Sequence, residues 1–343
     1  MSPSLRFPEF TGEWEKCKIE DITDAVSSGK SKNHFSNGEY NLYGSTGIIG
    51  RTDKALYDGK LVLVARVGAN AGFLQIINEP CGITDNTLIL KPKGIDAFYL
   101  YYFLQHFNLN RLIFGSGQPL ITGGMLKKVK VSLGTISEQS KIVKFLSLLD
   151  ERIATQVRLI DRLQSLMIGI AQKIAHSNKP NVRISDCLEC SSSALQESEV
   201  NKTGKYPVYG ANGIVGYIDK YHTQNEAIYI IKDGSGVGGV SYVTGKCSST
   251  GTLNILQAKN GHSLKYLYYL LKVFNFVPYK TGMAIPHIYF KDYGKAKIFC
   301  PAYPEQLEYA KLLSSIDGNL RIALDSLKNF NLQKQYLLRH MLI

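Results

Sequence analysis

The chain has 343 residues, and 44% of them are hydrophobic, which excludes a globally disordered protein. Its formal net charge of +12 favours a polyanionic partner, because released counterions drive binding to phosphate groups. Residues 1–18 lack a signal-peptide core, and no window approaches the roughly 20 apolar residues of a membrane span. We therefore expect a cytoplasmic protein whose six cysteines are reduced thiols.

The sequence contains two copies of one segment. Residues 43–50 (YGSTGIIG) return at 209–216 as YGANGIVG, and residues 99–104 (YLYYFL) return at 266–271 as YLYYLL. The Glu-Gln pair at 138–139 returns at 305–306. The offset stays between 165 and 167 residues, which is too long for a solenoid repeat. These matches indicate that a whole domain and a following helix are duplicated.

Within each copy the same elements follow one another. Apolar runs at 60–65 and 227–231, bounded by Gly, Asp and Asn, predict buried strands. A short helix comes next, with Asp96 or Ser263 as its N-cap, and its Tyr and Leu side chains are best interpreted as core rather than as base-stacking groups. A Gly/Pro loop (115–119 or 281–286) and a last strand (128–133 or 295–300) lead into a long helix.

The long helix of each copy carries apolar side chains at alternating spacings of four and three. This heptad pattern predicts an intramolecular antiparallel helix pair. Gln156 and Lys334 are polar at positions of the seam and could fix its register. In the first copy the seam comprises Leu149, Ile153, Ile160, Leu163, Met167 and Ile170. In the second copy it comprises Ile316, Leu320, Leu327, Phe330 and Leu337.

The expected architecture is α+β, with two β-rich domains in tandem pseudo-twofold repeat and two long antiparallel helices. The predicted segments are 1–140 (first domain), 141–178 (first helix), 179–307 (second domain) and 308–343 (second helix). About 26 residues of helix span roughly 39 Å, and one turn of B-DNA is about 34–36 Å. Such a pair would hold two unlike domains about one DNA turn apart. We therefore expect a bipartite target with an unread gap.

The ordered motifs resemble a known family. Residues 6–14 (RFPEFTGEW), the two YGxxGIxG boxes, the loop 65–72 (ARVGANAG) and the Glu-Gln step into a long helix are similar to specificity subunits of type I restriction-modification systems. The resemblance covers the whole chain in order. It implies a non-catalytic subunit that docks two adenine methyltransferase subunits and further restriction subunits. S-adenosylmethionine would then be held by the partner, with no cofactor in this chain.

Other motifs in the chain favour structural interpretations. Residues 234–239 (GSGVGG) have dinucleotide-fingerprint spacing, but a strand is expected after them where a helix would be needed. Cys187 and Cys190 have metal-ligand spacing without a second close pair, so no metal is expected. His34 and His287 have no carboxylate or Cys near them in sequence, which argues against a catalytic triad. No phosphate-binding loop and no Asn-Pro-Pro-Tyr methyltransferase motif occur.

Base readers should be long polar side chains on loops, where Arg suits guanine and Asn or Gln suits adenine. In the first copy the candidates for contact with double-stranded DNA are Lys30, Lys32, Asn33, His34, Arg51, Arg66, Asn70 and Gln118. In the second copy they are Lys202, Lys205, Asn212, Lys232, Ser235, Lys280 and His287.

Three alternatives stay open. The chain could serve a related system whose endonuclease is fused to the methyltransferase, which the sequence does not distinguish. It could be a β-rich enzyme acting on a polyanion, although no carboxylate pair or metal cluster recurs in both copies. It could be a scaffold held by its helices alone, but such a scaffold would have no reason to be basic. A salt titration distinguishes a scaffold from a DNA-binding protein, because phosphate contacts make the affinity for DNA fall steeply with salt concentration.

Overall fold

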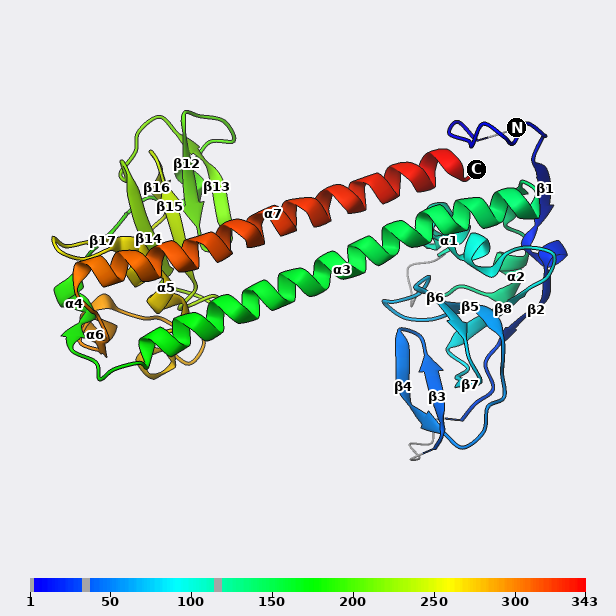
Figure 1. The fold of residues 1–343 in the computed structure, drawn as a ribbon, viewed down its shortest axis with the longest axis horizontal. Coiled ribbons are helices and arrows are strands. Elements are labelled where there is room, and N and C mark those ends of the chain that lie inside the picture. Colours follow the sequence, from blue (N-terminus) through cyan, green and yellow to red (C-terminus); the bar gives the residue numbers. More distant parts are fainter. Residues whose placement is uncertain (1–2, 33–37, 114–118) are drawn as a thin grey trace. The chain divides into compact units, whose positions relative to one another are not determined.

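The structure is a computed structural model that describes residues 3–32, 38–113 and 119–343. The chain divides into two units (Figure 1). Unit 1 comprises Met1–Val157 and Ser326–Ile343, and unit 2 comprises Arg158–Asp325. Each unit therefore holds one copy of the repeat together with part of each long helix.

Both units contain the same three sheets. In unit 1 the strand orders are β1-β9, β2-β8-β5-β6 and β4-β3-β7, and in unit 2 they are β10-β18, β11-β17-β14-β15 and β13-β12-β16. The strands of unit 1 are β1 (Glu15–Lys18), β2 (Thr23–Ser28), β3 (Tyr40–Gly44), β4 (Gly47–Thr52), β5 (Lys60–Ala65), β6 (Leu74–Asn78), β7 (Cys81–Ile83), β8 (Thr87–Pro92) and β9 (Lys130–Leu133). The strands of unit 2 are β10 (Val182–Arg183), β11 (Leu188–Ser192), β12 (Tyr206–Gly210), β13 (Gly213–Ile218), β14 (Glu226–Ile231), β15 (Val240–Thr244), β16 (Ser248–Ser249), β17 (Leu253–Ala258) and β18 (Lys297–Ile298). The identical order shows that the duplication read from the sequence is a duplication of fold.

Short helices complete each unit. Those of unit 1 are α1 (Ala97–Phe107), α2 (Gly123–Lys127) and the 3-10 turns η1 (Ile19–Ile22) and η2 (Leu109–Leu112). Those of unit 2 are α4 (Ile184–Cys187), α5 (Leu264–Val273), α6 (Phe290–Tyr293), η3 (Glu197–Glu199) and η4 (Val277–Tyr279). The equivalent helices α1 and α5 each pack on the four-stranded sheet of their own unit.

The two apolar runs form the central strands of the cores, as predicted. Residues 61–65 of β5 are at most 2% exposed, and residues 227–230 of β14 are fully buried. Each of these strands lies between two neighbours in its sheet, so its backbone donors and acceptors are paired on both sides. A continuous apolar run suits such a strand because both of its faces are covered.

The Tyr-rich helices α1 and α5 belong to the cores. The Asp96 side chain accepts hydrogen bonds from the N–H groups of Phe98 and Tyr99, and Ser263 caps α5 in the same way through Tyr266. The Tyr99 hydroxyl donates to the Ser132 carbonyl at 3.0 Å, and the hydroxyl of buried Tyr266 donates to the equivalent Phe299 carbonyl at 2.9 Å. Burial with a satisfied hydroxyl confirms the interpretation as packing rather than base stacking.

Two long helices follow the β-rich parts: α3 (Ile136–Ala175, 40 residues) and α7 (Tyr303–Met341, 39 residues). A buried glutamine ties the first turn of each to its own unit. Gln139 accepts from the Asp96 N–H at 3.1 Å and donates to the Gly134 carbonyl at 2.9 Å. Gln306 makes the same pair of bonds to Ser263 and Pro301, at 2.9 and 2.8 Å. The Glu-Gln pair recurs in both copies because its glutamine joins the long helix to the preceding domain.

The two long helices run antiparallel. In unit 1 the beginning of α3 contacts the end of α7, since Leu149 shares a core cluster with Leu337 and Met341. In unit 2 the second half of α3 meets the first half of α7, where Met167 and Leu320 line one apolar pocket. These contacts agree with the antiparallel pairing expected from the heptad pattern.

The predicted seam positions differ in burial. Buried members are Leu149, Ile160, Met167, Ile316, Leu320 and Leu337. Half-buried members are Ile153, Leu163, Ile170, Leu327 and Phe330. The polar seam residue Lys334 forms an ion pair with Asp150 of α3, with Nζ and Oδ1 2.6 Å apart. The segment limits 140/141, 178/179 and 307/308 stay predictions.

The residues just before β1 are fastened to α3. Glu138 is 1% exposed, and its carboxylate receives two bonds from the Arg6 guanidinium, at 2.6 and 2.8 Å. The indole N–H of Trp14 donates to the same carboxylate at 3.1 Å. The Leu5 N–H also donates to the His340 carbonyl of α7 at 2.9 Å. Arg6 and Trp14 thus form a clamp on the Glu138 carboxylate, which gives both residues of the segment 6–14 a structural role.

Candidate nucleic-acid interface

The Gly-rich loop after β5 lies beside the segment that follows residues 115–118. Gly68 N–H donates to the Pro119 carbonyl at 3.0 Å, and Ile121 N–H donates to the Arg66 carbonyl at 2.8 Å. Val67 and Leu120 form an isolated antiparallel bridge between the two segments. The fold thus brings together two loops whose bridged residues, Val67 and Leu120, lie 53 residues apart in sequence.

Unit 2 repeats this loop pairing. Gly234 N–H donates to the Pro286 carbonyl at 3.0 Å, and Ile288 N–H donates to the Lys232 carbonyl at 2.9 Å. Asp233 and His287 form the bridge that matches Val67 and Leu120. The predicted strand after this loop is present as β15, which confirms that the GxGxxG spacing opens no helix here.

Glycine is required at equivalent points of both loops. Gly68 and Gly72 have φ values of +80° and +89°, and their counterparts Gly234 and Gly238 have +94° and +91°. L-residues with a side chain rarely adopt this conformation, so the loop path depends on glycine.

Among the described candidates of unit 1, Arg66 is the most enclosed. It is half-buried, and its guanidinium donates to the Ser28 hydroxyl at 3.3 Å. Its Nε is buried and has no hydrogen-bond partner among the described residues. A buried donor without a partner is costly and suits a group that a ligand completes. Asn70 lies exposed on the same loop, in a surface pocket with Gln105 and Asn110. Gln118 lies outside the described residues.

In unit 2, His287 has a carboxylate partner that its sequence neighbourhood does not show. Its Nδ1 lies 2.6 Å from Oδ1 of Asp233, and both side chains are about one-third exposed. A carboxylate on Nδ1 orients the imidazole ring. The Thr281 hydroxyl donates to the His287 carbonyl at 3.3 Å. Lys232 and Ser235 lie on the Asp233 loop, and Lys280 precedes the His287 segment.

A second basic group lies beside the three-stranded sheet of unit 1. Lys30, Lys32 and Lys54 are exposed and line one surface hollow of about 390 Å³, together with Asp53. Arg51 is exposed on the neighbouring strand β4 and donates to the Glu39 carbonyl at 3.0 Å. Lys54 was not predicted from the sequence, because its relation to Lys30 depends on how the strands fold together. Asn33 and His34 lie outside the described residues.

Half-buried polar contacts hold this sheet in place. Glu79 accepts hydrogen bonds from the Asn41 amide at 2.7 Å and from the Tyr43 hydroxyl at 2.6 Å. These bonds lower the pKa of Glu79, so the carboxylate stays charged as an acceptor. Burial, followed by the bond to Glu79, raises the pKa of Tyr43 to about 12 and keeps its hydroxyl a donor.

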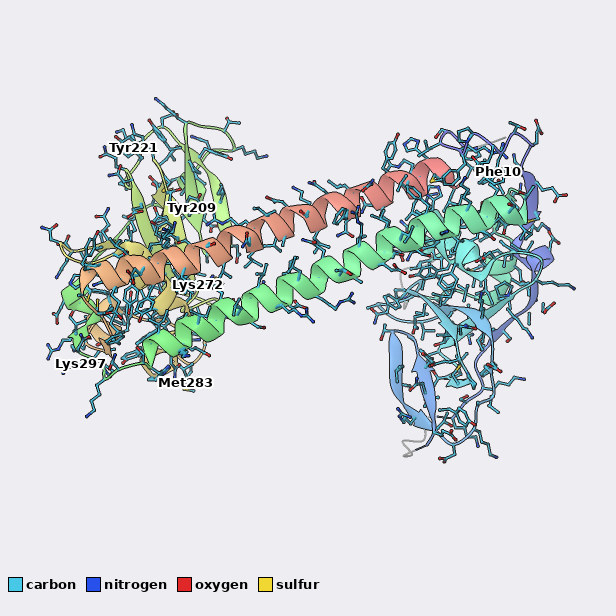
Figure 2. The ribbon with its side chains drawn as sticks, viewed as in Figure 1. Phe10, Tyr209, Tyr221, Lys272, Met283 and Lys297 are labelled. Atoms are coloured by element: carbon cyan, nitrogen blue, oxygen red, sulfur yellow. The ribbon has the colours of Figure 1, made fainter. Side chains whose placement is uncertain are left out.

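The equivalent sheet of unit 2 carries aromatic rings among its basic residues. Tyr206 and Tyr221 meet edge to face, with ring centroids 5.1 Å apart (Figure 2 labels Tyr221). Lys205 lies over the Tyr206 ring and Lys246 over the Tyr221 ring, at 5.4 and 4.8 Å. Lys202 and Asn212 are exposed nearby in sequence, Asn212 at the β12–β13 turn. Sequence reasoning missed Tyr221 and Lys246, because no local pattern connects them with Lys205.

The candidates thus fall into a loop group and a sheet group in each unit. In unit 1 these are Arg66 with Asn70, and Lys30 with Lys32 and Arg51. In unit 2 they are Lys232, Ser235, Lys280 and His287, and Lys202, Lys205 and Asn212. Long basic and amide side chains beside aromatic rings can contact phosphates and base edges. Among the described residues, no helix combines the length and apolar character needed to cross a membrane.

Solved structures share this fold. The chain is similar over 100% of its length to 99% of the S subunit of a type I restriction-modification system from M. genitalium, with a TM-score of 0.74 and 20% identity. It is also similar over 96% of its length to 97% of a chain from a study of complex assembly and conformational transition of the type I system, with a TM-score of 0.56 and 13% identity.

Two curated relatives match part of the chain. A putative type I restriction enzyme specificity subunit (S.HindORF215P) of Haemophilus influenzae is 25% identical over 35% of this chain, and the EcoprrI specificity subunit of Escherichia coli is 26% identical over 37% of it. These matches span about a third of the relatives' own lengths, at 32% and 31%.

The structure defines a tandem protein in which two copies of one β-rich domain each precede a long helix. The model of the type I restriction modification DNA specificity domain matches residues 11–165 and again 177–329. Because the two matches cover most of the sequence, the chain belongs to this family of type I specificity subunits.

Proposed function

We propose that this chain is the non-catalytic specificity subunit of a type I restriction-modification complex and reads a bipartite, gapped duplex DNA target. One observation carries the proposal. In both units an isolated β-bridge joins the paired loops at equivalent positions. It is formed by Val67 and Leu120 in unit 1 and by Asp233 and His287 in unit 2. Equal backbones with unlike side chains are what two reading domains with different half-sites require.

The continuity of α3 supports a target with two separated halves. The helix has 40 residues, so at 1.5 Å per residue it extends about 60 Å. This length exceeds one turn of B-DNA, which is about 34–36 Å. Each unit would then bind one half-site, and the bases between the two half-sites would be left unread.

We further propose that two methyltransferase subunits dock on the long helices. Their exposed faces carry large apolar side chains, such as Leu148 and Leu166 of α3 and Ile322 of α7, which are 52%, 51% and 66% exposed. Large apolar side chains that are exposed to solvent can form protein interaction surfaces. Adenine methylation, with S-adenosylmethionine, would then be performed by those partners, and restriction subunits would join the same complex in the cytoplasm.

The half-site proposal predicts that two equivalent substitutions affect different halves of the target. Arg66→Ala should relax base preference in one half of the target, and Lys232→Ala in the other half, because the two residues follow equivalent strands in different units. Loss of one good base contact corresponds to about a tenfold loss of discrimination. Binding selection with each variant, in complex with its methyltransferase, measures the effect. Loss in both halves from either variant would show that the units do not read independently.

A further inference from the structure

Three metal-ligating side chains meet in unit 2. Sγ of Cys187, Sγ of Cys300 and a ring nitrogen of His262 all lie within 4.8 Å of one another. Cys300 Sγ is 3.6 Å from His262 Nδ1. Both cysteines are buried and the imidazole is half-buried. Cys190, which has the CxxC spacing with Cys187, is not part of this cluster.

Fixed backbone contacts position the three side chains. Cys187 ends α4, and its carbonyl accepts from the Lys259 N–H at 2.9 Å. The His262 N–H in turn donates to the Lys259 carbonyl at 3.1 Å, just before the N-cap of α5. Asn181 makes two 2.8 Å hydrogen bonds to the backbone of Cys300. Ligands held in this way are preorganised before a metal binds.

The distances suit tetrahedral zinc. Zinc binds thiolate sulfur at about 2.3 Å and imidazole nitrogen at about 2.0–2.1 Å, so a tetrahedral S···N edge is about 3.6 Å. The Cys300–His262 distance is 3.6 Å.

The first copy provides a comparison within the same chain. At the repeat offset, Cys187, His262 and Cys300 correspond to Ile22, Ile95 and Leu133. These three side chains belong to, or pack against, the apolar core of unit 1. Three apolar residues at one place in unit 1 are thus replaced together by three metal-ligating residues in unit 2. A structural requirement for burial alone would not select Cys, His and Cys at all three positions.

We propose that Cys187, His262 and Cys300 bind one Zn²⁺ ion, with the fourth coordination position taken by water or an added ligand. The ion would join the start of the unit 2 domain at α4, the α5 entry loop and the end of the domain after β18. It would stabilise unit 2 alone. This differs from the sequence-based expectation of no metal, because two of the three ligands are distant in sequence from Cys187.

Cobalt provides the spectroscopic test. The full chain, kept reduced and freed of metal by a chelator, is titrated with Co²⁺ and then with Zn²⁺. We expect about one equivalent of Co²⁺ to give a thiolate-to-cobalt band and the visible bands of a tetrahedral site, and Zn²⁺ to remove them. Cys300→Ser and His262→Ala should abolish or strongly weaken these bands, whereas Cys190→Ser should keep them.

A second variant separates metal binding from folding. The triple substitution Cys187→Ile, His262→Ile, Cys300→Leu installs the side chains of the first copy, so it should fold but show no cobalt band and no rise in melting temperature with Zn²⁺. A reduced wild-type chain without the band would overturn the proposal, as would a band that survives the triple substitution. Isolation of a Cys187–Cys300 disulfide with no metal binding after reduction would overturn it too.

Discussion

Glu138→Ala should lower the melting temperature of unit 1 by about 5 °C or more. The substitution removes the acceptor of both Arg6 bonds and of the Trp14 indole bond, and it leaves these donors beside a buried space. A charge that loses its buried partner is strongly destabilising. Trp14 is the single tryptophan of the chain, so its fluorescence reports the clamp directly. The emission should shift to the red in the native state as the indole becomes hydrated.

The second copy supplies a matched control for this substitution. Glu305 occupies the equivalent position at the start of α7, but it is exposed and accepts from the Tyr309 hydroxyl, at 2.8 Å. Glu305→Ala should therefore change the melting temperature by less than about 1 °C. Equal losses in the two variants would show that the position in the helix, rather than the Arg6–Trp14 clamp, determines stability.

Replacing Lys30, Lys32 and Lys54 together with Ala should weaken DNA binding by about tenfold or more. Three phosphate contacts would be lost, so the slope of log affinity against log salt should fall in magnitude by about 2 to 3. Fluorescence anisotropy with a target duplex, at several salt concentrations, measures both quantities. Base preference should change little, because phosphate contacts position the protein without reading sequence.

A second variant, which removes the same amount of positive charge elsewhere on unit 1, serves as the control for the effect of net charge. Lys16, Lys128 and Lys130 are also exposed, but they lie at the β1–β9 sheet. Their combined replacement with Ala lowers the net charge by the same amount and should leave most of the affinity and slope intact. If both triple variants lose affinity equally, the binding depends on overall charge and not on the hollow formed by Lys30, Lys32 and Lys54.

Local patterns predicted the elements of the fold. The strands β5 and β14, the caps Asp96 and Ser263 and the buried Tyr-rich helices each follow from short stretches of sequence. The internal repeat of the sequence also predicted that the two units share one topology. These features are predictable because burial and helix capping depend on neighbours within a few turns.

Contacts between distant segments could not be predicted in this way. Asp233 meets His287, and Arg6 meets Glu138, across 54 and 132 residues. No spacing rule connects such residues before the sheets are assembled. The cysteines show the same limit, because the CxxC spacing drew attention to Cys190 while the fold places His262 and Cys300 beside Cys187. The bases contacted by Arg66, Lys232 and the other loop candidates stay predictions.

Selection from random duplex DNA, with the chain purified in complex with its methyltransferase, tests the proposed function most directly. Two unlike recognition domains in one chain predict an enriched asymmetric motif, with two specified halves separated by an unspecified gap of constant length. A single ungapped motif, or no enrichment despite a bound methyltransferase, would contradict the reading of DNA by two domains.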